Sequence, residues 1–222
     1  MRFSLHLSPP DGLVPFDYQH HLTGAFWKFL GEGIEHDQTS LYSLSFLTGG
    51  RPARGGLAFP NGATWTVSAP DPDLHRRLLG GVMRDPRLAF GMRIDEVREV
   101  PVPTFGLMQR FRVNGAVLAR GKRDDGTQEH LLFGDDHADV ALTRSLRWKL
   151  HLAGRDDLAE TAEMRFDRTY ERARTKLVAI KGMRYRCSEC PVLVSGDPEA
   201  VGFAFLVGAG ELTGSCLGAL TL

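Results

Sequence analysis

The end of the chain is rich in glycine. After an apolar segment at residues 201–207 come Gly208, Gly210 and Gly214 with Ser215, and then Gly218 within the final apolar run at 217–222. Glycine tolerates positive φ and lets other atoms come close to the backbone. Successive amides in such a loop form a concavity that suits phosphate oxygens. We therefore predict a phosphate-binding loop that its apolar flanks hold at both ends, in preference to a flexible tail.

This loop matches no common nucleotide-binding motif. No GxGxxG opens a helix, and no Gly-Lys-Ser/Thr is present. A nucleotide-binding enzyme that uses the loop remains an alternative. It ranks low because no helix pattern follows the glycines and no carboxylate pair has a recognisable spacing for Mg²⁺.

Length and net charge limit the number of domains and the kind of partner that the sequence allows. The 222 residues suffice for one large domain or two domains of roughly 100 residues each. The formal net charge is zero, so any polyanion partner must be recognised by a local patch. The sequence shows neither a signal-peptide pattern nor an apolar run of membrane-spanning length. We therefore expect a cytoplasmic protein without a membrane partner.

The three cysteines give no sign of a disulfide framework or a complete metal site. Cys187 and Cys190 have the spacing of half a zinc knuckle, but a tetrahedral site needs two more ligands at a recognisable spacing. Cys216 leaves the total odd, which is not typical of a secreted disulfide-rich protein. We expect no metal and no cofactor.

The first half of the chain alternates strand and helix patterns. Asp17 is the expected N-cap of the first helix, and Asp71 or Asp73 lies at the start of the second. The order strand-helix-strand, strand-helix-strand is that of a ferredoxin-like βαββαβ unit, which we place at residues 1–103. The expected elements are strands at 2–8, 41–47, 63–68 and 90–102, and helices at 18–30 and 70–83.

The second half is less regular, and we interpret it as a second ferredoxin-like domain at residues 104–222. Two strands are expected to pair about Gly182, and the glycine-rich loop precedes the last strand. The predicted fold class is therefore α+β, with two tandem ferredoxin-like domains. The expected elements are strands at 105–117, 129–133, 165–180, 183–194 and 217–222, helices at 138–152 and 197–206, and helical turns within 156–163.

Basic residues are concentrated between Asp167 and Arg186. Arg172, Arg174 and Lys176 alternate along an expected strand and should share one face, where they would bind RNA phosphates. The alternative is a solvated edge strand protected by its charge. The seven basic residues, against the two acidic residues Asp167 and Glu171, are Arg168, Arg172, Arg174, Lys176, Lys181, Arg184 and Arg186. Residues that extend the same surface are Lys122, Arg123, Arg144, Arg147 and Lys149.

One histidine stands out among the eight. His36 lies beside Asp37 in a polar loop between the first helix and the second strand. An exposed imidazole titrates near neutrality and can exchange protons at working pH. We expect most of the other histidines to be structural.

Four features occur together: the opening Met-Arg-Phe strand, the helix from Pro15 to Leu30, the loop His36-Asp37-Gln38 before the second strand, and the glycine-rich loop. In this combination the chain resembles the CRISPR-associated endoribonucleases that cut repeat RNA, the Cas6 family of the RAMP superfamily. The resemblance spans the chain. The terminal loop is its more specific signal, because the histidine loop is short.

The resemblance implies a reaction and a partner. CRISPR repeat RNA would be cleaved without metal, by attack of a 2′-hydroxyl on the adjacent phosphorus, to give a 2′,3′-cyclic phosphate and a 5′-hydroxyl. His36 is the expected general base or acid, and the glycine-rich loop and the basic strands would hold the RNA. Association with other CRISPR effector subunits, or with a second copy of the chain, stays open.

The chain departs from the family pattern at two positions. Members often place a tyrosine on the first helix where this chain has Trp27, and a lysine before the second strand where it has Ser40. Lys28 and His20 are the candidate substitutes, with Lys28 able to stabilise phosphate charge. These departures support an alternative, a repeat-RNA-binding subunit that has kept the fold and lost the chemistry.

Overall fold

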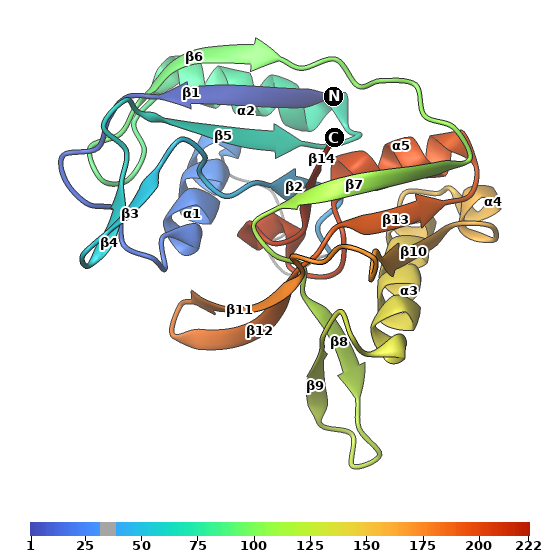
Figure 1. The fold of residues 1–222 in the computed structure, drawn as a ribbon. Helices are drawn as coiled ribbons and strands as arrows, with labels where there is room; N and C mark the ends of the chain where they lie inside the picture. Colours follow the sequence, from blue (N-terminus) through green and yellow to red (C-terminus); the bar gives the residue numbers. More distant parts are fainter. Residues whose placement is uncertain (32–38) are drawn as a thin grey trace.

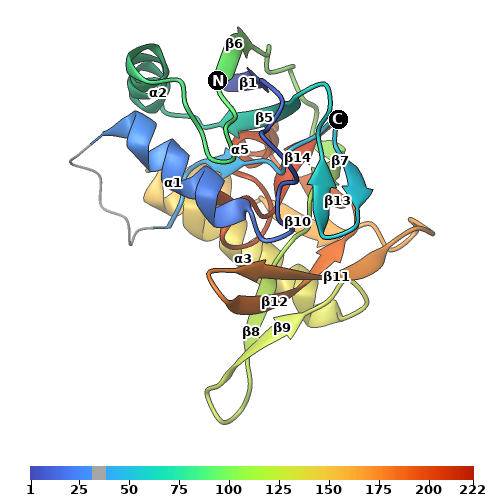
Figure 2. The same ribbon diagram turned by 90° about the vertical axis from the view of Figure 1, so that its left-hand side faces the viewer.

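Two four-stranded antiparallel sheets lie side by side in the computed structural model, which describes residues 1–31 and 39–222. The two termini meet where the sheets adjoin (Figure 1). Helices cover one side of the sheets (Figure 2). Among the described residues, no helix is both long and apolar enough to cross a membrane.

The first sheet has the order β2-β5-β1-β6. Helices α1 and α2 complete the unit, and Gly81 allows them to approach closely, since a Cβ at this position would collide with the backbone of Phe29. Trp65, Phe26 and Phe29 are buried at the centre of its core. The elements are β1 (Arg2–Leu7), α1 (Gln19–Leu30), β2 (Ser43–Leu44), β5 (Ala63–Ser68), α2 (Pro72–Arg84) and β6 (Ile94–Glu99).

The second sheet has the order β10-β13-β7-β14. Its core is built around Phe111, Phe166 and Phe205, and apolar side chains of α3 belong to the same cluster. The elements are β7 (Met108–Asn114), α3 (Asp136–Leu152), α4 (Asp156–Ala159), β10 (Glu163–Phe166), β13 (Val192–Ser195), α5 (Pro198–Val207), η1 (Thr213–Ser215) and β14 (Ala219–Thr221).

Both sheets follow the same connectivity. If the four strands of each unit are numbered in chain order, both sheets have the strand order 2-3-1-4. This is the arrangement that a βαββαβ ferredoxin-like unit requires. The predicted fold class is confirmed. The predicted boundary between residues 103 and 104 falls between β6 and β7, and it stays a prediction.

Three hairpins lie outside the two sheets. They are β3 (Arg51–Ala53) with β4 (Gly56–Ala58), β8 (Ala119–Lys122) with β9 (Gln128–Leu131), and β11 (Arg174–Ile180) with β12 (Met183–Glu189). The strand expected at 129–133 therefore belongs to a projecting hairpin and not to the second sheet. The pairing expected about Gly182 is confirmed, with Lys181 and Gly182 at φ 49° and 78° in the turn. In the chain β10 precedes β11 and β13 follows β12, and β10 and β13 pair with each other in the second sheet.

Several element ends differ from the sequence expectations. The strand expected at 41–47 is reduced to Ser43–Leu44, because the amides of Phe46 and Leu47 donate to the side chains of Asn114 and Tyr18. The expected N-cap Asp17 is wrong, since α1 begins after Tyr18 without a side-chain cap. Asp71 caps α2 as predicted, accepting a bond of 2.8 Å from the amide of Asp73.

Hydrogen bonds join the two units along their contact. The guanidinium of buried Arg2 donates to Leu220 O at 2.7 Å and lies 4.5 Å from the ring centroid of Phe205. Ser43 Oγ donates to Leu206 O at 2.9 Å. Thr213 Oγ1 donates to Tyr42 O at 2.8 Å. The first and last strands and the glycine-rich loop thus form the joint between the two units.

Candidate nucleic-acid interface

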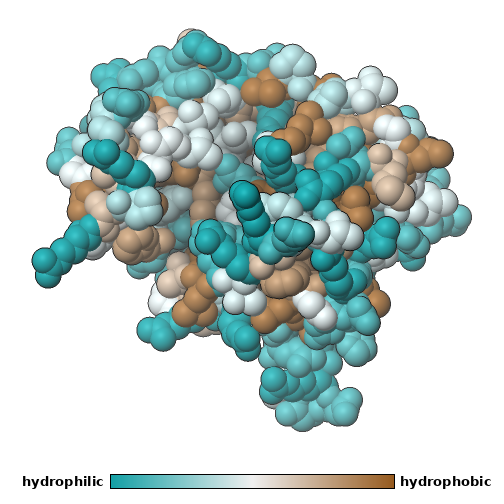
Figure 3. Space-filling model, viewed as in Figure 1, coloured by the Kyte–Doolittle hydropathy of each residue, from teal (hydrophilic) through white to brown (hydrophobic). Residues whose placement is uncertain are grey.

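A groove of about 570 Å³ opens where the two sheets meet, and we call it the basic groove. Its walls come from the segment after β2, from the end of β7 and from the base of the β11–β12 hairpin. Hydrophilic side chains gather near the middle of the face that Figure 3 presents. The charged residues that line the groove are Arg112, Arg172, Arg174, Lys176 and Glu189.

The basic groove carries more positive than negative charge. Among the described residues that line it, Glu189 is the one carboxylate, and it accepts from Lys176 Nζ at 2.5 Å and from Arg174 Nε. Although burial opposes ionisation, the bonds from Lys176 and Arg174 hold the pKa of Glu189 below its usual value. Arg112 and Arg172 pair with no carboxylate among the described residues. The groove therefore keeps an excess of positive charge that suits phosphate.

An aromatic ring accompanies these charges. Lys176 Nζ lies 5.1 Å from the centroid of the Phe46 ring, within the range of a cation–π contact. Phe46 belongs to the first unit and Lys176 to the hairpin of the second. The contact places the predicted basic strand directly against the first unit.

The structure brings together three of the predicted basic residues and separates the others. Arg172, Arg174 and Lys176 line the basic groove. Arg174 and Lys176 share a face of β11 as expected, whereas Arg172 lies in a turn before β11 and not on the expected strand. Arg184 pairs with Ala179 on the opposite face of the hairpin, and Lys181 lies in its turn. Arg112 was missed, because only the pairing of β7 with β13 and β14 brings it beside the hairpin.

Arg168 has a structural role. Its Nη1 donates to Asp139 Oδ2 at 2.7 Å, and its Nε and Nη2 donate to the carbonyl oxygens of Phe133 and Asp135. These bonds tie the segment after β10 to the start of α3. The guanidinium is therefore largely occupied within the protein.

The glycine-rich loop packs tightly against the rest of the chain. Gly208, Gly210 and Gly218 have φ of 78°, 70° and 67°, and a Cβ at Gly210 or Gly218 would collide with the carbonyl groups of Leu118 or Ala209. Gly214 lies against the side chains of Ser40 and Tyr42. Close internal packing thus explains why these positions need glycine.

Several amides of the loop are already used. Gly218 N donates to Ala116 O at 2.8 Å, Gly208 N to Ala204 O at 2.8 Å, and Ser215 N to Leu212 O at 2.8 Å. Gly218 and Gly208 are also buried. These amides do not face a phosphate in this conformation.

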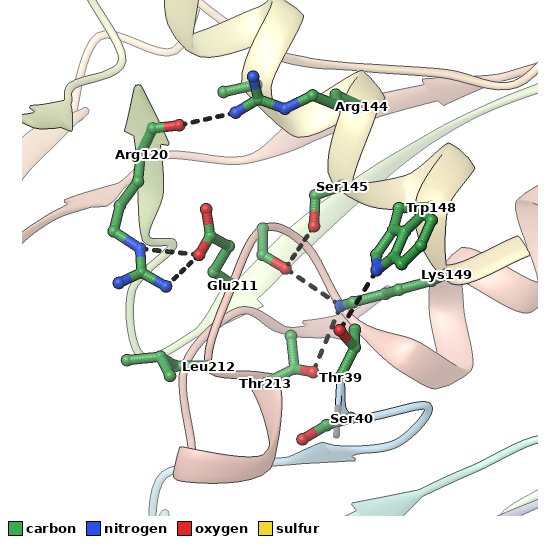
Figure 4. Close-up of a pocket in the computed structure, with 12 residues that line it drawn as sticks. Thr39, Ser40, Arg120, Arg144, Ser145, Trp148, Lys149, Glu211, Leu212 and Thr213 are labelled. Carbon is green, nitrogen blue, oxygen red and sulfur yellow. Dashed lines mark hydrogen bonds and ion pairs between the residues drawn. The ribbon is translucent and has the colours of Figure 1, made fainter. Parts of the chain in front are cut away.

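A buried lysine organises the loop. Lys149 on α3 is only 2% exposed, so the expectation that it extends the surface is wrong. Its ammonium donates to Gly210 O at 3.1 Å and to Thr213 Oγ1 at 3.3 Å (Figure 4). It also donates to Val207 O at 3.2 Å. Burial lowers the pKa of Lys149 to about 7, and Glu211 opposes this shift. Its place three residues after buried Leu146 was a signal of burial in the sequence.

The predicted catalytic residues are only partly described. His36 lies outside the described residues. His20 and Lys28 lie eight residues apart on α1, a rise of roughly 12 Å along the helix axis. His20 Nδ1 lies 2.8 Å from Asp17 O, and Lys28 Nζ donates to Asp85 Oδ2 at 3.2 Å and to Arg87 O at 2.5 Å. The structure does not bring His20 and Lys28 together.

Trp27 and Ser40, the two departures from the expected family pattern, both lie close to the glycine-rich loop or to the residues that contact it. Trp27 contacts Tyr42 edge-on, with ring centroids 6.2 Å apart. Ser40 touches the glycine-rich loop at Gly214. Burial raises the pKa of Tyr42 to about 12, so this phenol stays protonated at neutral pH. Trp27 and Ser40 therefore flank the same contact between α1, β2 and the loop.

The architecture and the groove define a double ferredoxin-like protein with a basic cleft between its units. Solved structures share this fold over the full chain. A structure from the characterisation of a Cas6-related gene from Pyrococcus furiosus covers 100% of this chain and 97% of its own, with a TM-score of 0.86 and 16% identity.

The descriptions of two further structures mention RNA. One is described as a RAMP protein binding different RNA substrates, with TM-score 0.84, 16% identity and coverage of 100% and 99%. The other is Thermus thermophilus Cse3 bound to an RNA representing a pre-cleavage complex, with TM-score 0.53, 15% identity and coverage of 100% and 98%. No family model and no curated protein match the sequence. At these identities the likeness shows the fold, and the structural neighbours are CRISPR-associated proteins of the Cas6 and RAMP type.

Proposed function

We propose that this chain is a Cas6-type endoribonuclease that binds CRISPR repeat RNA in the basic groove and cleaves it. The observation that carries the proposal is the groove itself, where Arg112, Arg172, Arg174 and Lys176 converge between two ferredoxin-like units. Unpaired guanidinium groups at such a site suit phosphate oxygens, which accept bidentate hydrogen bonds from arginine. The fold shared with RNA-bound Cse3 supports the same assignment.

The proposed chemistry is an internal transesterification. The 2′-hydroxyl of one nucleotide loses its proton and attacks the adjacent phosphorus, and the bond from phosphorus to the 5′-oxygen of the next nucleotide breaks. That oxygen takes a proton and leaves as a 5′-hydroxyl, while the phosphate closes into a 2′,3′-cyclic diester. The reaction needs a base, an acid and positive charge near the phosphorane.

His36 is the proposed proton-transfer residue, because an imidazole can act as base or acid near neutral pH. Lys28 and His20 remain the candidates for the second role, although their distance along α1 allows only one of them to lie beside a single phosphate. Lys28 would have to exchange its contact with Asp85 for the RNA. The exposed Arg184 and Lys181 of the hairpin would contact RNA beyond the groove.

A specific observation favours a second candidate function, a repeat-RNA-binding subunit without chemistry. Trp27 packs against Tyr42 and cannot transfer a proton, and Ser40 offers no positive charge. In this case the basic groove would bind RNA as proposed and no cleavage would follow. Other subunits of a CRISPR ribonucleoprotein would then supply the missing step.

One experiment separates the two candidates. The purified protein and a His36→Ala variant are incubated in EDTA with labelled repeat RNA transcribed from the CRISPR array of the same genome, and both binding and cleavage are measured. The nuclease proposal predicts cleavage by the wild type that leaves a cyclic phosphate. It also predicts loss of cleavage, with binding retained, in the variant. Binding by both proteins without cleavage by either supports the binding subunit instead.

A further inference from the structure

A second cavity, of about 560 Å³, opens beside the glycine-rich loop, and we call it the α3 pocket. Its walls are one face of α3, the start of β8, residues 210–213 of the loop, and Thr39 with Ser40 of the first unit (Figure 4). This volume lies in the range of roughly 300–1,000 Å³ typical of small-ligand sites. No described residue lines both the α3 pocket and the basic groove.

An exposed tryptophan forms one wall of the α3 pocket. Trp148 is 51% exposed, which is unusual for so large an apolar side chain. Its Nε1 donates to Thr39 Oγ1 at 3.3 Å, and its ring stacks on His151 with centroids 5.4 Å apart. These two contacts hold the indole in place across the contact between the two units. A fixed and exposed aromatic ring is the element on which an unpaired base stacks.

The charges around the pocket favour an anion. Arg120 is bound by Glu211, which neutralises that pair. Arg144 donates from Nη2 to Arg120 O at 3.1 Å, and no carboxylate among the described residues pairs with it. Arg144 is exposed and lies one helical turn from Trp148 on α3. A ring and an unpaired guanidinium thus occupy neighbouring positions of the same wall.

We propose that the α3 pocket holds one unpaired nucleotide of the RNA substrate, with its base stacked on Trp148 and its phosphate bound by Arg144. This inference rests on the proposed RNA-binding function and adds a second contact to the basic groove. Stacking on an aromatic ring tolerates any base, so the contact selects unpaired RNA without selecting a sequence. A base paired within a duplex cannot enter the pocket, because its faces are covered by its neighbours.

The test combines affinity with site-specific crosslinking. The same repeat RNA is prepared with single 4-thiouridine substitutions along its length, and its binding is measured for the wild type and for Trp148→Leu, Trp148→Phe and Leu107→Ala. Leu107 is exposed between β6 and β7 and lines neither cavity, so its variant controls for the loss of an exposed apolar side chain. Trp148→Phe removes the bond to Thr39 and keeps a ring.

The expected result is a crosslink from one RNA position to residues of α3. Trp148→Leu should bind roughly 5- to 150-fold more weakly, which corresponds to the energy of one base–aromatic stack. Trp148→Phe and Leu107→Ala should stay near the wild type. The crosslink should be lost in Trp148→Leu.

Three other results overturn the inference in distinguishable ways. If the wild type binds the RNA but no position crosslinks to α3 and Trp148→Leu binds normally, the pocket is not a nucleotide site and the proposed function stands. The pocket is also ruled out as a nucleotide site if Trp148→Phe is as weak as Trp148→Leu, because the bond to Thr39 would then explain the effect. If the wild type does not bind the RNA at all, the proposed function fails and the inference with it.

Discussion

The ammonium of Lys149 lies 3.1 Å from the carbonyl oxygen of Gly210, which also accepts from Ser145 Oγ at 3.0 Å. Two neighbouring turns of α3 thus fix one residue of the glycine-rich loop. The loop in turn reaches the first unit, where Thr23 Oγ1 donates to Gly214 O at 3.2 Å and Thr213 Oγ1 to Tyr42 O at 2.8 Å. A helix of the second unit therefore sets the position of the joint between both units.

Replacement of this lysine should destabilise the fold. Lys149→Met keeps the length of the side chain and removes the donors to Val207 O, Gly210 O and Thr213 Oγ1. Buried acceptors that lose a charged donor cost about 1.5–3 kcal/mol of unfolding free energy. Urea unfolding measures the loss. Lys122→Met, at the exposed end of β8, is the matched control and should change stability by less than about 0.5 kcal/mol. Equal stability of both variants would contradict this role.

Lys149 should also make the free energy of unfolding depend on pH. Its pKa is about 7 in the folded protein and near its ordinary value of 10.5 in the unfolded chain. Between about pH 7 and 10.5 the unfolded chain holds a proton on Lys149 that the folded protein has lost. The contribution of Lys149 to the free energy of unfolding therefore rises with pH. The slope approaches about 1.4 kcal/mol per pH unit above pH 7. Below about pH 7 both states are protonated and the contribution is constant.

Urea unfolding of the wild type and of Lys149→Met between about pH 6 and 8.5 measures this term as their difference. That range stays below the ordinary thiol pKa, which matters because burial raises the pKa of Cys190 to about 11 and of Cys187 to about 12. We expect the rise of the unfolding free energy above pH 7 to be smaller in the variant. Identical pH profiles would show that Lys149 does not change its protonation on folding in this range.

Two glycines with similar φ separate backbone strain from close packing. Gly218 and Gly126 have φ of 67° and 80°, but a Cβ would meet the Ala209 carbonyl at Gly218 and open space at Gly126. Gly126→Ala should cost about 1 kcal/mol from conformational strain alone. Gly218→Ala should cost about 2–5 kcal/mol because the backbone must also move apart. Thermal or urea unfolding compares them, and similar losses would refute the packing explanation for the loop.

Sequence reasoning succeeded where short-range pattern decides structure. The alternation at 63–68, the capping by Asp71 and the turn at Gly182 gave correct elements. The βαββαβ order of the first half, with a less regular second half interpreted as another such unit, gave the correct fold class. Arg174 and Lys176 were correctly expected to share a face, because a strand places alternate residues on one side. Arg172 lines the same groove from a turn before β11, so the strand expected to carry it is wrong.

The remaining features depend on tertiary packing. The strand from 41 to 47 is cut short by bonds to Asn114 and Tyr18, which lie far away in the sequence. Arg112 joins the basic groove only through the order of strands in the second sheet. Lys149 looks like a surface residue by its type, and only the acceptors of residues 207–213 make its burial acceptable.

The central claim is that the basic groove holds RNA phosphates, and the most direct test is the salt dependence of RNA affinity. Arg112→Gln and Arg172→Gln each remove one unpaired charge from the groove, and Arg76→Gln removes an exposed charge on α2 outside it. Affinity for the repeat RNA is measured over a series of salt concentrations.

Each groove variant should bind more weakly, and its plot of log affinity against log salt should be shallower by about 0.7–0.9 for each lost phosphate contact. Arg76→Gln should match the wild type in both respects. If the groove variants keep the affinity and the slope of the wild type, RNA binds elsewhere and the proposed interface is wrong.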